Sequence, residues 1–144
     1  MKIYIASQFF NKNERKNIQK AINILRDRGF ELFVPMEHFI PNGEQMSNND
    51  WGKAVFNMDV NAIEECTHLV CLYYGLYSDS GTAFECGLAY KKGIPIINVC
   101  CNKKITSLMI MNGANLNLSS INDLKTINFN NLNENNYEVL NEQK

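Results

Sequence analysis

Residues 68–100, HLVCLYYGLYSDSGTAFECGLAYKKGIPIINVC, carry the pattern from which the fold of this chain can be predicted. The apolar runs 68–74 and 94–100 each predict a strand that is buried on both faces of a sheet. Between them, residues 82–92 predict a helix that ends at Gly93, since glycine commonly follows the last turn of a helix. Strand, helix and strand in this order, with short connections, predict two parallel strands and a helix packed on their sheet.

The same alternation of strands and helices continues on both sides of this unit. The other predicted strands cover residues 2–7, 30–35 and 114–119, and the other predicted helices cover residues 13–29 and 106–113 and a segment that begins near Ser47 or Asn48. We therefore expect an α/β fold: a single doubly wound, flavodoxin-like domain over residues 1–144. Its five-stranded parallel sheet should have the order 2-1-3-4-5, with helices on both faces. From about residue 120 the chain becomes an Asn-rich, weakly patterned tail.

Composition and charge narrow the class of protein and its partners. With 144 residues, 45% of them hydrophobic and 20% charged, the chain is typical of one globular domain. A formal net charge of −1 without a basic run argues against a nucleic-acid partner. No signal peptide and no apolar stretch of membrane-spanning length are recognisable, so we expect no membrane partner and a cytoplasmic location.

The five cysteines predict neither a disulfide framework nor a metal site. They are odd in number, lack Cys-x-x-Cys spacing and lie mostly in apolar runs, as buried reduced thiols do. A nucleophilic role for Cys86 is a minor alternative, because His38 and His68 offer it no clear partner. The sequence predicts no metal and no cofactor.

The residue that raises the functional question is Glu85, in the segment SDSGTAFECGLAY at 78–90. In the predicted strand order, the loops after the first and third strands meet at the switch point of the sheet, where ligands bind in such folds. Glu85 would then lie at the floor of that pocket, and a helix start would keep its carboxylate ionised. The alternative is an ordinary surface carboxylate that favours the helix dipole. Apolar and small neighbours, including Gly81 and Gly87, favour the functional interpretation.

Three motifs resemble the nucleoside 2-deoxyribosyltransferases in order and spacing. They are IYIASQFF at 3–10, FNMDVNAI at 56–63, and DSGTAFECGLA at 79–89 followed by KGIPI at 92–96. The resemblance runs from Lys2 to about Leu118, and the Asp-to-Glu block is its most specific part. The glycine usual after the first-strand tyrosine is replaced here by Ala-Ser-Gln.

The resemblance implies three catalytic residues. Glu85 would be the nucleophile, Tyr4 the phenol that hydrogen-bonds it, and Asp59 the carboxylate near the leaving base. Each also has a structural interpretation: Tyr4 alternates with isoleucines in a buried strand, and Asp59 could lie on a helix surface. The substrate-binding set implied by the resemblance consists of Ala6, Ser7, Phe9, His38, Asp79, Gly81, Ser107 and Met109.

The residues expected at the sugar 5′ end give conflicting predictions about whether a 5′-phosphate can bind. By the resemblance, Asp79 meets the 5′ hydroxyl, and Ser107 reaches the same end from a neighbouring subunit. Asp79 would repel a 5′-phosphate, whereas Ser107 would accept one. The related 2′-deoxynucleoside 5′-monophosphate N-glycosidases bind such a phosphate without this repulsion. Asp79 could instead only cap a helix or turn. We expect nucleosides to be favoured over nucleotides.

The implied function is transfer of 2-deoxyribose between nucleobases, with a covalent deoxyribosyl-glutamate intermediate, in nucleoside salvage. The partners would be 2′-deoxynucleosides, free nucleobases and further copies of the chain, as a dimer or higher homo-oligomer whose sites a neighbour completes. Two alternatives remain open: an N-glycosidase that hydrolyses deoxynucleosides or their 5′-monophosphates, and a non-catalytic module that binds such ligands.

Overall fold

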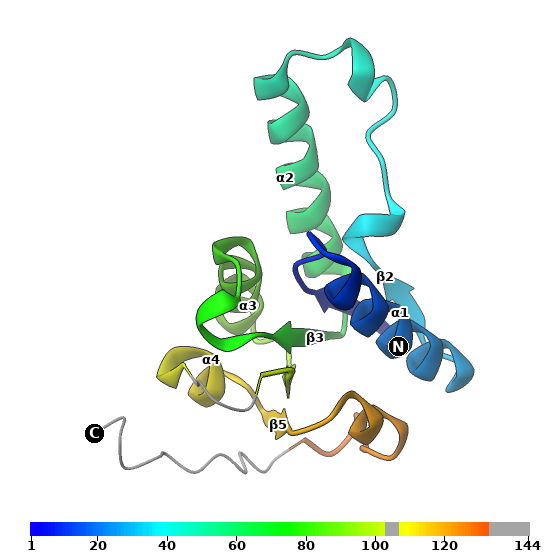
Figure 1. Cartoon of the computed structure of the whole chain (residues 1–144), viewed down its shortest axis with the longest axis vertical. Helices are drawn as coiled ribbons and strands as arrows, with labels where there is room; N and C mark the ends of the chain where they lie inside the picture. The colour runs from blue at the N-terminus through cyan, green and yellow to red at the C-terminus, as the bar shows by residue number, and fades with distance from the viewer. Residues whose placement is uncertain (103–106, 133–144) are drawn as a thin grey trace.

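A computed structural model describes residues 1–102 and 107–132 of the chain (Figure 1). Its sheet has five strands, all parallel, in the order β2-β1-β3-β4-β5, which confirms the predicted doubly wound topology. The strands are β1 (Lys2–Ala6), β2 (Glu31–Phe33), β3 (His68–Tyr73), β4 (Ile96–Cys100) and β5 (Leu116–Leu118).

The helices begin and end at residues that satisfy their free backbone groups. They are α1 (Lys12–Asp27), α2 (Asn48–Glu65), α3 (Ser80–Lys92) and α4 (Leu108–Gly113). The side chains of Asn11, Ser47 and Asp79 accept hydrogen bonds from the first turns of α1, α2 and α3. Gly93 follows α3 with φ +73°, a left-handed conformation that glycine adopts without strain.

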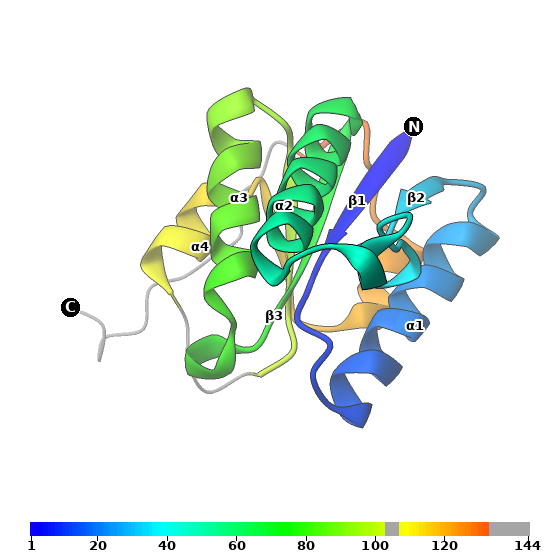
Figure 2. The same ribbon diagram turned by 90° about the horizontal axis from the view of Figure 1, so that it is seen from above.

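Helices cover both faces of the sheet, and alternate residues of each strand point to opposite layers. Ile3 and Ile5 of β1 pack with α1, whereas Tyr4 and Ala6 pack with α2 and α3. Figure 2 shows α2, α3 and α4 on one side of the sheet and α1 on the other. The two hydrophobic cores are therefore separated by the sheet, and the Tyr4 side faces the helix that carries Glu85.

The first part of the Asn-rich tail is packed into the α1 core. A 3-10 turn at Ile121–Lys125 buries Leu124 completely, and Phe129 and Leu132 are also buried beside α1. The Arg28 guanidinium donates to the carbonyl oxygens of Leu124 at 2.6 Å and Ile127 at 2.8 Å. The rest of the predicted tail lies outside the described residues.

Helix α2 is only partly a core helix. Its buried residues are Ala62 and Ile63, close to its C-terminal end. The N-terminal half of α2 and the segment that leads to it project beyond the sheet (Figure 1). The apolar side chains of Trp51 and Val55 on this half of the helix line a cavity and are not part of the core.

Two further features bear on the class of protein. All five cysteines are free thiols, and Cys66, Cys71 and Cys86 are buried as predicted. Within residues 1–102 and 107–132, no helix combines the length and apolar character needed to cross a membrane.

Candidate active site

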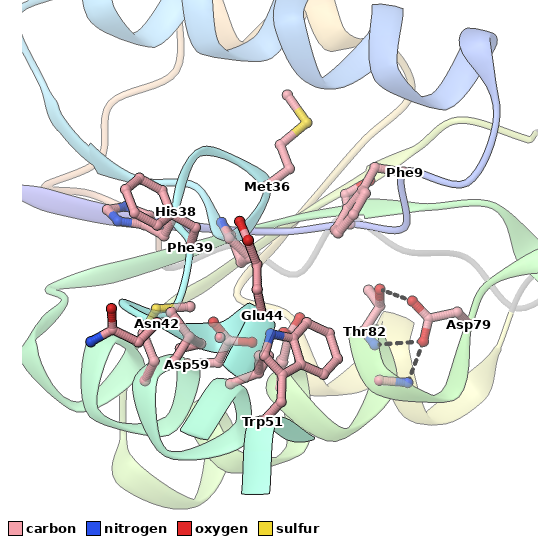
Figure 3. A pocket seen from close by; sticks show the side chains of 18 of the residues that line it. Phe9, Met36, His38, Phe39, Asn42, Glu44, Trp51, Asp59, Asp79 and Thr82 are labelled. Atoms are coloured by element: carbon pink, nitrogen blue, oxygen red, sulfur yellow. Dashed lines mark hydrogen bonds between the residues drawn. The ribbon is translucent and has the colours of Figure 1, made fainter. Parts of the chain in front are cut away.

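A cavity of about 720 Å³ lies beyond the carboxyl ends of the central strands. Four segments wall it: the loop after β1, the segment 35–45 after β2, the N-terminal half of α2, and the start of α3. Figure 3 shows labelled side chains from each of these segments around it, including Phe9, Glu44, Trp51 and Asp79. This is the switch point of the sheet, where the order reverses between β1 and β3.

At this cavity, Glu85 of α3 meets Tyr4 of β1. The Tyr4 hydroxyl donates to Glu85 Oε1 at 2.8 Å, although 81 positions separate the two residues. Tyr4 is fully buried, and its ring stacks on Phe33 at 5.4 Å. Phe33 in turn stacks on His38 at 4.2 Å, with an interplanar angle of 7°. The phenol is thus held between the sheet and an aromatic stack that leads to the cavity wall.

Burial of Glu85 changes its acid–base behaviour. Desolvation raises the pKa of its carboxyl to about 8, with a further rise from the charges of Asp59 and Asp79, while the hydrogen bond from Tyr4 lowers it. Burial therefore opposes the sequence-based expectation that the helix start keeps Glu85 ionised. The physical reason is position: Glu85 lies in the second turn of α3, beyond the free N–H groups, and burial outweighs the dipole.

Asp59 is the second carboxyl group of the cavity. Burial raises its pKa, while the nearby imidazole of His38 opposes that rise. Its Oδ1 atom is buried, and no donor among the described residues lies within hydrogen-bonding distance of it. A buried acceptor without a partner is costly unless a ligand or water satisfies it. Asp59 is therefore suited to exchange a proton or hydrogen bond with a bound molecule.

Asp79 lines the cavity and also caps α3. Its carboxylate accepts hydrogen bonds from the amides of Gly81 and Thr82 and from the Thr82 hydroxyl at 3.1 Å, drawn as dashed lines in Figure 3. A Cβ at Gly81 would lie 2.8 Å from Asp79 Oδ1, so a larger residue there would displace the carboxylate that caps the helix. The capping role that the sequence left open is real, and Asp79 nonetheless borders the cavity.

The structure brings most, but not all, of the predicted site residues together. Of the eleven residues predicted for the site, it places the following on the cavity wall: Ser7, Phe9, His38, Asp59, Asp79, Gly81 and Glu85. Ala6 is fully buried in the core beside Tyr4 and does not line the cavity, because its side chain packs between the sheet and helices α2 and α3. Ser107 and Met109 line a separate hollow of about 390 Å³ between α3 and α4.

Sequence reasoning did not assign several residues of the cavity wall. They include Met36, Asn42, Glu44, Trp51, Val55, Met58 and Thr82. The signal for Trp51, Val55 and Met58 was present, because they share the face of α2 that carries Asp59. Glu44 had no such signal, since it lies in an irregular segment between β2 and α2.

The charge of the cavity is strongly one-sided. Four carboxyl groups line it, from Glu44, Asp59, Asp79 and Glu85, and none of its described lining residues is lysine or arginine. No group of three metal-ligating side chains suited to an ion occurs within the described ranges. The site is therefore built around carboxyl groups and a phenol, with an aromatic wall.

Paired carboxyl groups at a cavity are typical of enzymes that act on glycosidic bonds. The chain belongs to the nucleoside 2-deoxyribosyltransferase family, whose model matches residues 3–139. It is thus a member of a family of enzymes that act on N-glycosidic bonds.

Solved structures agree with this assignment. A 2-deoxyribosyltransferase from Bacillus psychrosaccharolyticus is 33% identical, with a TM-score of 0.84, over 92% of this chain and 96% of that one. A conserved protein from Enterococcus faecalis V583 is 23% identical (TM-score 0.70; 87% and 94% covered), and a CMP N-glycosidase from Clostridium botulinum is 21% identical (TM-score 0.59; 87% and 95% covered). These two likenesses concern the fold alone. Comparison with curated proteins gave no match.

Proposed function

We propose that this protein is a nucleoside 2-deoxyribosyltransferase, which moves 2-deoxyribose from one nucleobase to another in nucleoside salvage. The observation that carries the proposal is the Tyr4–Glu85 hydrogen bond of 2.8 Å at a cavity that also holds Asp59, whose Oδ1 has no hydrogen-bond partner among the described residues. The 33% identity to a 2-deoxyribosyltransferase over nearly the whole chain supports it. The free thiols favour a reducing compartment, and we place the reaction in the cytoplasm.

In the first half-reaction, a Glu85 carboxylate oxygen attacks C1′ of the sugar as the bond from C1′ to the base nitrogen breaks. The electron pair of that bond leaves with the base, and a proton from the Asp59 carboxyl neutralises it. The raised pKa of Asp59 supports the role of proton donor. The products are a deoxyribosyl ester on Glu85, a free base and an Asp59 carboxylate.

In the second half-reaction, a nitrogen of another base attacks C1′ and displaces Glu85. Asp59 takes the proton that this nitrogen loses, so both carboxyl groups return to their starting states. Two displacements at one carbon give retention of configuration. Attack by water in place of the base would give hydrolysis, so the fate of the ester separates a transferase from an N-glycosidase.

Substrates without a phosphate suit the charge of the cavity best. A 5′-monophosphate would bring a dianion beside four carboxyl groups, with no lysine or arginine among the described lining residues to offset it. We therefore propose 2′-deoxynucleosides and free nucleobases as the substrates, with Phe9 and the Phe33–His38 stack beside the base.

We also propose that the protein acts as a homo-oligomer. Family resemblance predicts that Ser107 and Met109 contact the substrate. In this chain they line the hollow between α3 and α4, not the cavity that contains Glu85. They could contribute only to the cavity of another copy. Large apolar side chains on this side of the molecule, such as Met109 at 83% and Tyr90 at 67% exposure, are available for such contact.

The test is incubation of the protein with deoxyinosine or thymidine, with and without free adenine, followed by chromatography. Formation of deoxyadenosine only when adenine is present is the expected result. Release of free base without a new nucleoside would identify a hydrolase instead. No change with any deoxynucleoside or monophosphate would support a binding module.

The nucleophile can be tested separately. Glu85→Ala and Glu85→Gln should lose turnover by several orders of magnitude while the circular dichroism spectrum is unchanged, because the proposed ester forms on the Glu85 carboxylate. Mass spectrometry after a slow 2-fluoro substrate analogue should find the adduct on Glu85. More than about a tenth of wild-type activity in either variant, or an adduct elsewhere, would refute the assignment.

A further inference from the structure

A buried glutamine joins the two walls of the cavity that come from β1 and β3. Gln8 lies between Ser7 and Phe9, which both line the cavity, but its own side chain turns inward and is only 5% exposed. Its Oε1 accepts a hydrogen bond of 2.8 Å from the backbone N–H of Asp79. Its Nε2 donates to Glu14 Oε1 at 2.7 Å. One carboxamide thus ties the β1 loop to the N-cap of α3 and to α1.

The partners of Gln8 are themselves fixed. Glu14 is buried in the first turn of α1, where its carboxylate also accepts from the amides of Phe10 at 2.7 Å and Asn11 at 3.2 Å. Burial alone would raise the pKa of Glu14, but the hydrogen bonds from Gln8, Asn11 and Phe10 outweigh it and lower the pKa. An ionised carboxylate on one side and an N–H donor on the other allow only one orientation of the carboxamide.

The tie acts on the reacting group through α3. Asp79 caps the helix on which Glu85 lies, and Glu85 must also stay at 2.8 Å from the Tyr4 hydroxyl on β1. If α3 shifts relative to β1, this bond and the position of the nucleophile change together. Displacements of about 1 Å in a reacting group can lower rates on the order of a hundredfold. Neither the capping of α3 nor that of α1 requires a glutamine at position 8. The two buried hydrogen bonds of its side chain therefore need another explanation.

We propose that Gln8 is a positioning residue for the reaction at Glu85: its carboxamide clamps the start of α3 against the β1 loop through Asp79 and Glu14. The inference rests on the proposed function for its catalytic consequence. It does not require contact between Gln8 and the substrate, and the Gln8 side chain does not line the cavity.

The test exchanges the two partners of the clamp. Gln8→Leu removes both hydrogen bonds, and Gln8→Glu places two carboxylates together. Glu14→Gln turns its new NH₂ group either toward the Gln8 NH₂ or toward the backbone N–H groups of Phe10 and Asn11, so two donors meet in both orientations. The double variant Q8E/E14Q restores one donor and one acceptor, and the carboxylate introduced at position 8 can still accept from the Asp79 N–H. Asn11 is exposed, so water can replace the contact that it loses to residue 14. Gln19→Glu, on the exposed face of α1, is the matched control.

We expect Gln8→Leu and both single exchange variants to lower kcat at least tenfold at a temperature where each is fully folded. The double variant should return to within about fivefold of wild type, and Gln19→Glu should stay within twofold. A kcat for Gln8→Leu within threefold of wild type, or a double variant no faster than the singles, would overturn the proposal.

Hydrogen exchange provides a readout that does not depend on activity. The Asp79 amide should be protected in wild type, exchange at least tenfold faster in Gln8→Leu, and regain protection in the double variant. Equal exchange in wild type and Gln8→Leu would show that no clamp exists. If wild type turned over no deoxynucleoside at all, the proposed function would fail, while the exchange data would still decide whether Gln8 holds α3.

Discussion

At the scale of single residues, the site depends on a carboxyl group in a place that disfavours its charge. Glu85 lies where desolvation raises its pKa to about 8, and Tyr4 provides the hydrogen bond that counteracts this rise. The phenol itself is poorly suited to ionise, because burial and the neighbouring charges of Glu85 and Asp59 raise its pKa well above the usual range. Tyr4 is therefore a hydrogen-bond donor, and in the proposed reaction Glu85 is the group that must ionise.

The first prediction concerns Tyr4→Phe and the pH dependence of the reaction. The proposed reaction needs Glu85 as a carboxylate and Asp59 as a proton donor, so kcat/KM of wild type should be bell-shaped in pH, with one limb set by the ionisation of Glu85 at about 8. Because the Tyr4 hydrogen bond lowers the pKa of Glu85, its removal should move this limb to higher pH and reduce kcat/KM at pH 7. Tyr77→Phe, at an exposed side chain, is the control. The same limb at the same pH in Tyr4→Phe would contradict the role assigned to the phenol.

The second prediction concerns Glu85→Gln and stability. A carboxyl whose pKa is higher in the folded than in the unfolded state binds its proton more tightly when folded. The free energy of unfolding of wild type should therefore decrease as pH rises from about 4.5 to about 8. Glu85→Gln lacks this loss, and at pH 9 we expect it to be more stable than wild type by on the order of 2 kcal/mol.

Denaturant unfolding at pH 5 and pH 9 measures this difference. At pH 5, wild type and Glu85→Gln should be nearly equal in stability. Glu31→Gln, at an exposed side chain, keeps Glu85 and should therefore lose stability between pH 5 and pH 9 as wild type does. Equal stability of Glu85→Gln and wild type at pH 9 would mean that burial does not disfavour the Glu85 carboxylate.

At the scale of elements, the start of α3 combines a structural and a functional task. Asp79 holds the first turn through its hydrogen bonds to Gly81 and Thr82, and the same carboxylate borders the cavity. Helix α2 has a similar division, since its last turns are buried at Ala62 and Ile63 whereas its first turns wall the cavity. Short stretches of these helices thus serve the core and the site together.

The third prediction is that Asp79→Ser changes substrate preference more than stability. Serine is nearly as good as aspartate at a helix N-cap, so the unfolding temperature should change by only a few degrees. Removal of a negative charge should shift the ratio of kcat/KM values toward deoxynucleoside monophosphates by about tenfold or more. Asp27→Ser, at an exposed position on α1, is the control.

Kinetics with one base, as nucleoside and as 5′-monophosphate, measure that ratio in wild type and in both variants. A wild type that already prefers the monophosphate would show that Asp79 does not face the 5′ end. An Asp79→Ser variant that unfolds far below wild type would show that serine cannot replace the cap.

At the scale of the whole molecule, two cores on opposite faces of one sheet hold the site in place. The core beneath α1 is completed by the segment after β5, in which Phe129 packs edge-on against Phe30 at 4.9 Å and lies beside His68. The backbone carbonyl oxygen of Phe129 also lies 2.9 Å from Nε2 of His68. This segment touches the face of the sheet opposite to the cavity.

The fourth prediction follows from that separation. Phe129→Ala should lower the free energy of unfolding by about 3 kcal/mol, because it empties a site where the ring is only 3% exposed. At 25 °C its kcat should stay within threefold of wild type, since the cavity lies across the sheet. Phe10→Ala, which truncates a ring that is 73% exposed, should lower stability by less than about 1 kcal/mol. Calorimetry measures the stability of these variants, and kinetics under the same conditions measures their kcat. Unchanged stability in Phe129→Ala would contradict the prediction.

Local patterns in the sequence were sufficient to predict the strand order and, to within two residues, the helix starts. Hydrophobic periodicity, the Gly93 stop and the connection lengths suffice for a parallel sheet, because local patterns and the handedness of crossovers leave few topologies. The pair Tyr4 and Glu85 was implied by the family resemblance of their motifs, and the structure shows their hydrogen bond at 2.8 Å.

The charge state and the walls of the site, in contrast, depend on tertiary packing. Burial from four segments, which no local pattern encodes, raises the pKa of Glu85 and leaves Asp59 Oδ1 without a partner among the described residues. The irregular segment that brings Glu44 to the cavity and the inward turn of Gln8 likewise depend on contacts between residues distant in sequence. Desolvation and long-range hydrogen bonds are properties of the packed molecule, and the order of residues alone does not reveal them.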